Sequence, residues 1–207
     1  MAKKRAFGQP QRRFGSTTAL DSVSLSGQRS FTLEVGKLVR RFLVPSIGIT
    51  IITWLRTGAL ISPRAEVELS PRLHIGRKTQ VSSFTKIKDA GGPLQIGQRC
   101  SISTGCIIGS GAGGTYIGDD CLIGPNCSIL GNTYRYDALD VPFAQQGHES
   151  KGTVIGNNVF IGANCVIVDG AHIEDNVMVG AHSLISGRIP KNSVVQGNPA
   201  KVLFTRR

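Results

Sequence analysis

Few side chains in this 207-residue chain can exchange a proton near neutral pH, and one of them stands apart. Of the four histidines, only His148 lies in the long stretch 130–154, where Glu149 follows it. Histidine has an ordinary pKa of about 6.5, which suits a general base. We predict that His148 is that base, and a solvated loop histidine is the alternative. Asp137 and Asp140 would orient the base or the substrate, or order the loop.

A six-residue repeat must position this stretch. It runs from about residue 61 almost to the end, as in the consecutive units Ile155-Gly156-Asn157-Asn158-Val159-Phe160 and Ile161-Gly162-Ala163-Asn164-Cys165-Val166. A period this short predicts an all-β solenoid, a parallel β-helix. The fourth position holds residues that tolerate a left-handed backbone, so it should form the corners. These residues are Gly105, Asp120, Asn126, Asn158, Asn164, Gly170, Asn176 and His182.

The first position of the unit is apolar and should point into a narrow interior, where β-branched side chains suit extended backbone. Most units follow at steps of six, but three steps are longer: 87 to 96, 108 to 117 and 129 to 155. Because their starting points are 21 residues apart, we predict a three-sided coil of 18 core residues with all insertions at one corner. The interior residues are Ile75, Val81, Ile87, Ile96, Ile102, Ile108, Ile117, Ile123, Ile129, Ile155, Ile161, Ile167, Ile173, Val179 and Ile185.

All five cysteines occupy the small fifth position of the unit: Cys100, Cys106, Cys121, Cys127 and Cys165. An odd number of thiols at interior positions favours small apolar filler over disulfides, metal ligands or a nucleophile. Free thiols also suit a reducing cytoplasm, and the basic segment 1–13 has no apolar run behind it, unlike a secretory signal. The remaining histidines, His74, His172 and His182, fit structural positions.

Charge divides the chain. The net charge is +11, and residues 1–60 hold ten Lys or Arg against two acids, whereas residues 61–207 hold fourteen against eleven. We predict a basic disordered tail over 1–30, an amphipathic helix and apolar cap over 31–60, and a β-helix domain over 61–207 with the loop 130–154. The helix is expected over 31–42.

The uncharged stretch 42–55 has two compatible interpretations. It is shorter than the roughly 20 residues that span a bilayer, and Pro45 interrupts it. It either covers the apolar end of the first coil, or rests with Trp54 and the basic tail on an anionic membrane. The second interpretation gives residues 1–58 a peripheral contact on the inner face of the cell membrane. Nucleic acid is not expected as a partner, because no aromatic stacking platforms accompany the basic residues.

The repeat, the excursion between Ile129 and Ile155, and the ending Gly197-Asn198-Pro199-Ala200-Lys201 resemble the hexapeptide-repeat acyltransferases. The similarity is greatest to the galactoside and surface-polysaccharide O-acetyltransferases, and it covers residues 61–207. The resemblance implies a left-handed parallel β-helix and a homotrimer with active sites between subunits. It also implies acetyl-CoA as the co-substrate, no metal, and a sugar or glycan hydroxyl as the acceptor.

In these relatives a histidine early in the long loop is the base, and the matching positions here are Asn132 and Tyr134. Neither residue is a histidine. An amide is not a useful proton acceptor, and tyrosine, with an ordinary pKa of about 10, is a poor base at neutral pH. The predicted catalytic set is therefore His148, with Tyr134, Asn132 and Asp137 around it.

The resemblance also assigns cofactor contacts. Pantetheine would run past small residues at Ala163, Gly180 and Ala181. The nucleotide end would lie near Asn198 and Lys201, where a lysine ammonium can pair with a phosphate.

Three functions stay open. We prefer an acetyl-CoA-dependent O-acetyltransferase acting on a surface polysaccharide or its precursor. The missing loop histidine would instead fit a non-catalytic trimeric scaffold or regulatory relative. A metal enzyme of the carbonic-anhydrase type would need three closely spaced histidines, which His172 and His182 do not supply.

Overall fold

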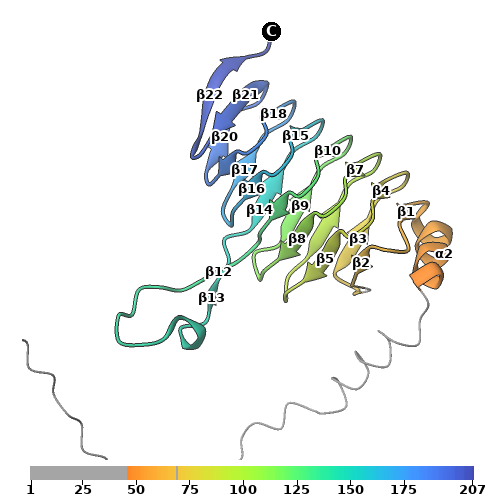
Figure 1. Cartoon of the computed structure of the whole chain (residues 1–207), viewed down its shortest axis with the longest axis horizontal. Coiled ribbons are helices and arrows are strands. Elements are labelled where there is room, and N and C mark those ends of the chain that lie inside the picture. The colour runs from red at the N-terminus through yellow and green to blue at the C-terminus, as the bar shows by residue number, and fades with distance from the viewer. Residues whose placement is uncertain (1–45, 69) are drawn as a thin grey trace, which may run out of the picture. The chain divides into compact units, whose positions relative to one another are not determined.

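The computed structural model describes residues 46–68 and 70–207. The predicted tail 1–30 and the predicted helix 31–42 lie outside these residues. The described part is a parallel β-solenoid with one short helix at its N-terminal side (Figure 1). The predicted solenoid is thereby confirmed.

Three sheets, here named A, B and C in chain order, form the three sides of the solenoid. Sheet A contains β1 (Leu60–Ile61), β4 (Gln80–Val81), β7 (Ser101–Ile102), β10 (Leu122–Ile123), β15 (Phe160–Ile161), β18 (Met178–Val179), β21 (Ser193–Gly197) and β22 (Ala200–Thr205). Sheet B contains β2 (Glu66–Val67), β5 (Lys86–Asp89), β8 (Ile107–Ser110), β11 (Ser128–Ile129), β16 (Val166–Ile167) and β19 (Leu184–Ile185). Sheet C contains β3 (Leu73–Ile75), β6 (Leu94–Ile96), β9 (Thr115–Ile117), β14 (Thr153–Ile155), β17 (His172–Ile173) and β20 (Arg188–Ile189).

Strand pairing confirms the predicted coil. Coils without an insertion pair residues 18 apart, such as Phe160 with Met178, and coils with a short insertion pair residues 21 apart, such as Gln80 with Ser101. The insertions follow β5, β8 and β11, which are neighbours in sheet B, and precede β6, β9 and β14 in sheet C. All three therefore leave from the corner between sheets B and C.

The interior is a single column of apolar side chains. Every predicted first-position residue is buried, and so are all five cysteines, which are free thiols. Burying an Ile or Val side chain contributes about 1.5–3 kcal/mol, so the stacked layers hold the coils together. The thiols are more than filler, because each donates a hydrogen bond to a backbone carbonyl of the next coil; Cys165 Sγ lies 3.2 Å from the Gly180 carbonyl oxygen.

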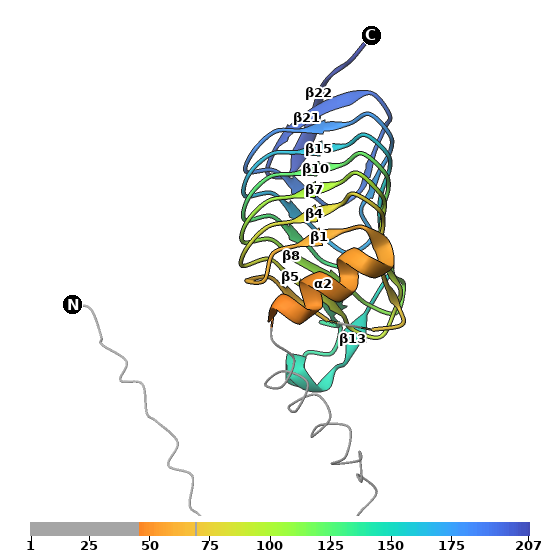
Figure 2. The same ribbon diagram turned by 90° about the vertical axis from the view of Figure 1, so that its right-hand side faces the viewer.

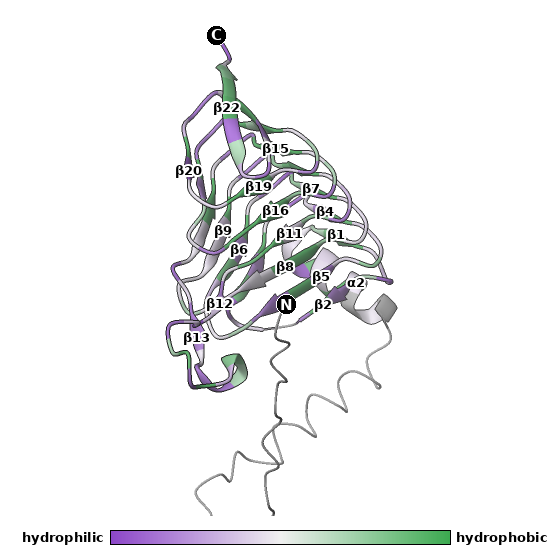
Figure 3. Ribbon diagram, turned by 60° about the vertical axis from the view of Figure 1, so that its left-hand side comes forward, coloured by the Kyte–Doolittle hydropathy of each residue, from purple (hydrophilic) through white to green (hydrophobic). Residues whose placement is uncertain are grey.

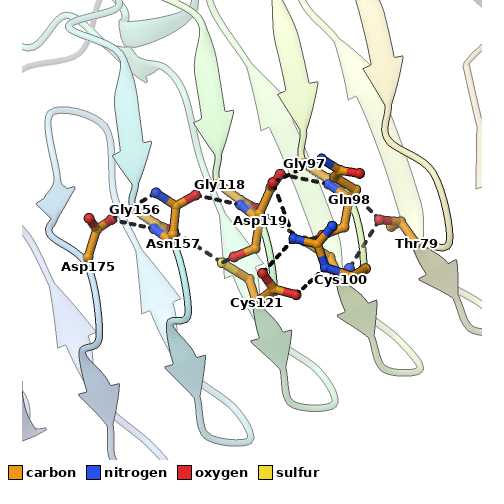
Figure 4. A network of polar contacts seen from close by, with 12 residues as sticks. Thr79, Gly97, Gln98, Cys100, Gly118, Asp119, Cys121, Gly156, Asn157 and Asp175 are labelled. Atoms are coloured by element: carbon orange, nitrogen blue, oxygen red, sulfur yellow. Dashed lines mark hydrogen bonds and ion pairs between the residues drawn. The ribbon is translucent and has the colours of Figure 1, made fainter.

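The corners have the predicted left-handed backbone. All eight predicted corner residues have positive φ, and so do Lys78, Phe84, Arg99 and Asn192 at the same position of other units. Figure 4 shows a polar ladder along the corner between sheets C and A, in which Asp119 accepts from the Gln98 amide at 2.9 Å and Asn157 accepts from the Asp119 amide at 2.9 Å. A Cβ on Gly97 would collide with the Asp119 carboxylate, which explains the glycine at the second position of this unit.

Helix α2 (Ser46–Thr57) lies beside β1 at the N-terminal end of the solenoid (Figure 2). The Thr50 hydroxyl donates to the Ile61 carbonyl at 2.7 Å, and Gly58, at φ +69°, ends the helix. Residues 46–55 of the uncharged stretch are thus helical, and the helix begins just after Pro45. No helix in the described part of the chain combines the length and hydropathy needed to span a bilayer.

Candidate active site

A long loop projects from the corner between sheets B and C, between Ile129 and Thr153 (Figure 1). Its arms form an antiparallel ladder of β12 (Thr133–Tyr134) and β13 (His148–Glu149), and a 3-10 turn, η1 (Phe143–Gln145), lies near its tip. In Figure 3 the loop carries both hydrophilic and hydrophobic residues, and none of residues 132–150 is buried. A loop of this kind presents side chains to solvent and not to the core.

The ladder places Tyr134 directly opposite His148. Their rings touch, with centroids 4.2 Å apart and planes tilted by 39°. Because aromatic rings at this separation attract each other, Tyr134 restricts the orientation of the imidazole. Tyr134, one of the two positions to which the resemblance assigns the base, and the loop histidine thus lie side by side in the structure.

His148 lines a hollow of about 460 Å³ together with Arg135, Tyr136, Asp137 and Glu149. All five residues are exposed, and the lining carries one guanidinium and two carboxylates. The hollow is polar and open, so it suits a hydroxyl-rich ligand better than an apolar one. The sequence did not single out Arg135 or Tyr136, although both lie within two residues of Tyr134, and Glu149 was noted only as the acid that follows His148.

Asp137 does not face the imidazole through a hydrogen bond. Its carboxylate pairs with Arg135, at 3.2 Å, and a hydrogen bond from that guanidinium keeps the pKa of Asp137 below its usual range. Asn132 is half-buried at the base of the loop and is not among the residues that line the hollow. Of the four predicted catalytic residues, the structure therefore brings His148, Tyr134 and Asp137 together.

Gln146 holds the outer part of the loop in shape. Its side-chain amide donates to the carbonyls of Ala138, at 2.8 Å, and Val141, at 2.7 Å, and its oxygen accepts from the Ala138 amide at 3.1 Å. The returning arm is fixed where it meets the solenoid, because Asp169 accepts from the amides of Lys151 and Gly152. The segment with His148 lies between these two anchors.

The predicted pantetheine contacts lie on a different corner, between sheets A and B. Ala163 follows β15, and Gly180 and Ala181 follow β18 one coil later. Earlier coils carry Ser83, Thr104 and Pro125 at the position of Ala163, so the last coils have the smaller side chains. Within residues 70–207, the backbone amides of Ala163 and Ala181 donate no hydrogen bond to another protein atom. These two amides, on adjacent coils, can bind an elongated polar ligand.

The hairpin of β21 and β22 continues this corner. Gly197 pairs with Ala200 and Gln196 with Lys201, which leaves Asn198 and Pro199 in the turn. The Gly197 amide donates to the Ser183 hydroxyl at 3.2 Å, so the hairpin is joined to the coil of Ala181. Lys201 is exposed and, in the described part of the chain, has no carboxylate within ion-pair distance. His182 takes the left-handed corner at φ +59°, also exposed.

No metal site is evident in residues 46–68 and 70–207, since these residues contain no group of three or more His, Cys, Asp or Glu side chains that could hold an ion.

Two family comparisons match the repeats. The family described as bacterial transferase hexapeptide (six repeats) matches residues 152–187, and the hexapeptide repeat of succinyl-transferase matches residues 114–131. No curated protein sequence matches significantly. The chain thus combines a parallel β-solenoid with repeats that match two hexapeptide-repeat families of transferases. The predicted resemblance to hexapeptide-repeat acyltransferases is confirmed.

Solved structures share the fold. AntD, an N-acyltransferase from Bacillus cereus in complex with dTDP and 3-hydroxybutyryl-CoA, has a TM-score of 0.63 at 20% identity over 72% of this chain and 81% of its own. A variant of perosamine N-acetyltransferase from Caulobacter crescentus, in complex with CoA and GDP-perosamine, has a TM-score of 0.53 at 21% identity, covering 82% of this chain and 62% of its own.

Proposed function

We propose that the protein is an acetyl-CoA-dependent O-acetyltransferase that acts on a sugar hydroxyl of a surface polysaccharide or its precursor. The observation that carries the proposal is the position of His148, which lines a polar hollow and lies directly opposite Tyr134 in the loop. Tyr134 is one of the two positions, with Asn132, to which the resemblance assigns the base of the O-acetyltransferases. An imidazole on β13 can therefore replace a histidine on β12. The CoA ligands in the complexes of both structural neighbours, and the GDP-perosamine in one of them, support acyl transfer to a sugar.

The reaction requires a base that takes up one proton and a sugar hydroxyl whose oxygen is held in a fixed position. His148 takes the proton of the sugar hydroxyl as that oxygen bonds to the acyl carbon, and it returns the proton to the departing sulfur. Acetyl-CoA supplies the acetyl group as a thioester, whose carbon–sulfur bond breaks. The Tyr134 ring orients the imidazole, and Arg135 and Glu149 offer hydrogen bonds to further sugar hydroxyls.

The two halves of the site lie on different corners of one chain. The loop with His148 leaves the corner between sheets B and C, whereas Ala163 and Ala181 lie on the corner between sheets A and B. A site that combines them is completed by a second copy, which supports the proposed homotrimer. In it, the free amides of Ala163 and Ala181 would hold the pantetheine arm, and Lys201 would hold a phosphate.

A direct assay separates this function from its alternatives. The purified protein is incubated with acetyl-CoA and two acceptors, a hydroxyl sugar and a nucleotide-linked amino sugar, and thiol release and product mass are followed. The proposal predicts thiol release with the hydroxyl sugar and a product that alkali cleaves, as expected for an ester. An alkali-stable amide would instead indicate N-acylation, and binding of acetyl-CoA without turnover would favour the scaffold alternative.

For location, we propose the cytoplasm, with a peripheral contact on the inner face of the cell membrane through residues 1–58. The tail charge supports this proposal at the level of the sequence.

A further inference from the structure

Helix α2 has its polar and apolar faces reversed relative to a helix that packs on a protein core. Thr50, Thr53 and Thr57 are half-buried on one side, and Thr50 bonds to the first coil. On the other side, Ile51, Ile52, Trp54 and Leu55 are exposed, with exposed fractions of 55% for Trp54 and 70% for Leu55. A surface helix normally buries its apolar stripe and exposes its polar residues. The outward face of α2, defined here as these four residues, is therefore built to meet an apolar partner.

The hydroxyls on the inward face are satisfied, so the reversal is stable. The Thr53 and Thr57 hydroxyls donate to backbone carbonyls one turn earlier, at 3.1 and 2.9 Å. The end of the helix is tied to the second coil, because the Gly58 carbonyl accepts from the Lys78 amide at 3.0 Å. The outward face is thus held in place by the solenoid, and exposing it costs free energy until a partner covers it.

The distribution of charge along the chain indicates the chemical nature of this partner. Residues 1–78 hold fourteen Lys or Arg against four acids, whereas residues 79–207 hold ten against nine. Almost the entire net charge of +11 thus belongs to the segment that contains α2 and the first coil. Within α2 itself the single charge is Arg56, which is exposed. Apolar side chains with a tryptophan, flanked by basic residues, fit the headgroup region of an anionic bilayer.

We propose that α2 docks the protein on an anionic membrane, with Ile51, Ile52, Trp54 and Leu55 inserted at the headgroup level and the basic residues of 1–78 near the lipid phosphates. This docking rests on the membrane contact proposed above and is independent of acyl transfer. Figures 1 and 2 show α2 at the opposite end of the solenoid from β18 and β21, so the cofactor corner stays clear of the bilayer.

Trp54 is the only tryptophan in the chain, so its fluorescence reports on this face directly. The full-length protein is titrated with vesicles of phosphatidylcholine and phosphatidylglycerol, and in parallel with vesicles of phosphatidylcholine alone. We expect a blue shift of the Trp54 emission and protection from iodide quenching with the anionic vesicles only. The variant Ile51→Ser/Leu55→Ser should bind these vesicles at least about tenfold more weakly. The matched control Ile107→Ser, at a residue 49% exposed on sheet B, should bind like the wild type.

The contradicting results are equally specific. Emission that does not change when the protein co-sediments with anionic vesicles would show that the tail binds and α2 does not. Emission that is already blue and protected without lipid would show that a second copy or residues 1–45 cover the outward face. Either result would overturn the docking, and because the wild-type readout needs no variant, misfolding of the double variant would not obscure it. Acyl transfer in solution is measured separately, so a failed docking leaves the enzymatic proposal standing.

Discussion

Tyr134 and His148 face each other across the β12–β13 ladder with their ring centroids 4.2 Å apart. Tyr134 is one of the two positions, with Asn132, to which the resemblance to the O-acetyltransferases assigns the base, and His148 is the only histidine of the loop. Because the two side chains are in contact, a base on β13 can reach the same substrate atom as a base on β12. This relationship is what makes an enzyme without the usual loop histidine chemically reasonable.

The buried thiols should be unreactive in the folded protein. The neighbouring Cys100 thiol and burial raise the pKa of Cys121 above its ordinary range, and Cys127 and burial do the same for Cys165. Hydrogen bonds with Cys121 and Cys127 lower the pKa of Cys100 and Cys106 to about 7, but these two thiols are buried as well. Because burial keeps reagents from all five cysteines, we expect labelling only after unfolding. Cys165→Ser should lower the free energy of unfolding by about 1–2 kcal/mol and leave turnover nearly unchanged. Rapid labelling of several thiols in the native protein would contradict the interior column.

Removal of residues 1–30 should separate electrostatic binding from catalysis. This segment holds six Lys or Arg against one acid. We expect the truncated protein to keep the oligomeric state and turnover of the full chain but to bind anionic vesicles more weakly, most clearly at low salt. Sedimentation and vesicle binding measure the two properties. Equal vesicle binding by both forms at low salt would refute the electrostatic contribution.

Gln146 should act as a positioning residue. Gln146→Ala removes three hydrogen bonds that shape the loop, so the imidazole and the hollow lose their fixed geometry. We expect kcat to fall by about tenfold with little change in acetyl-CoA affinity. Gln145→Ala is the matched control, since the hydrogen bond of Gln145 to Pro142 uses its backbone amide. Equal kinetics for the two variants would mean that the loop keeps its shape without Gln146.

Lys201 should contribute to binding of the nucleotide end. Lys201→Ala is expected to raise the Kd for acetyl-CoA by about twofold to fivefold, because an exposed ion pair contributes little in water. The loss should shrink as salt is added, and Lys201→Arg should restore affinity. Lys191→Ala, an exposed lysine on another corner, serves as the control in calorimetry. Unchanged affinity in Lys201→Ala would remove this residue from the cofactor site.

The solenoid could be predicted almost completely from the sequence because each position of the repeat has its own physical requirement. A first-position residue such as Ile161 must be apolar, and a corner residue such as Asn164 must tolerate positive φ, at 56° here. The corners at Lys78, Phe84 and Arg99 were missed because these residue types carry no left-handed preference. Asn192 was missed because its unit begins at Ile189, beyond the last first-position residue assigned from the sequence, Ile185. Helix α2 was predicted only as an apolar stretch. Its threonines face the solenoid and its apolar residues face outward, so its hydrophobic pattern does not resemble that of an ordinary amphipathic helix.

The candidate site was harder to predict, because it depends on contacts between residues far apart in the loop. Nothing in the sequence pairs Tyr134 with His148 across thirteen intervening residues; that register depends on how Gln146 and Asp169 fix the loop. Asp137 pairs with Arg135 and not with the imidazole of His148. The spacing of these residues in the sequence does not predict this choice of partner. Residue type indicated His148, and the resemblance indicated Tyr134 and Asn132. Only the fold supplied the contact between Tyr134 and His148 and the pairing of Asp137 with Arg135.

The most direct test of the account compares His148→Ala with Tyr134→Phe in acetyl transfer to a sugar hydroxyl. We expect His148→Ala to lower kcat by about two to four orders of magnitude at nearly constant acetyl-CoA affinity. Tyr134→Phe keeps the ring that touches the imidazole and should retain most of the activity. Loss of activity in Tyr134→Phe with a nearly silent His148→Ala would place the proton acceptor at the tyrosine. Full activity in both variants would contradict the placement of the site in this loop.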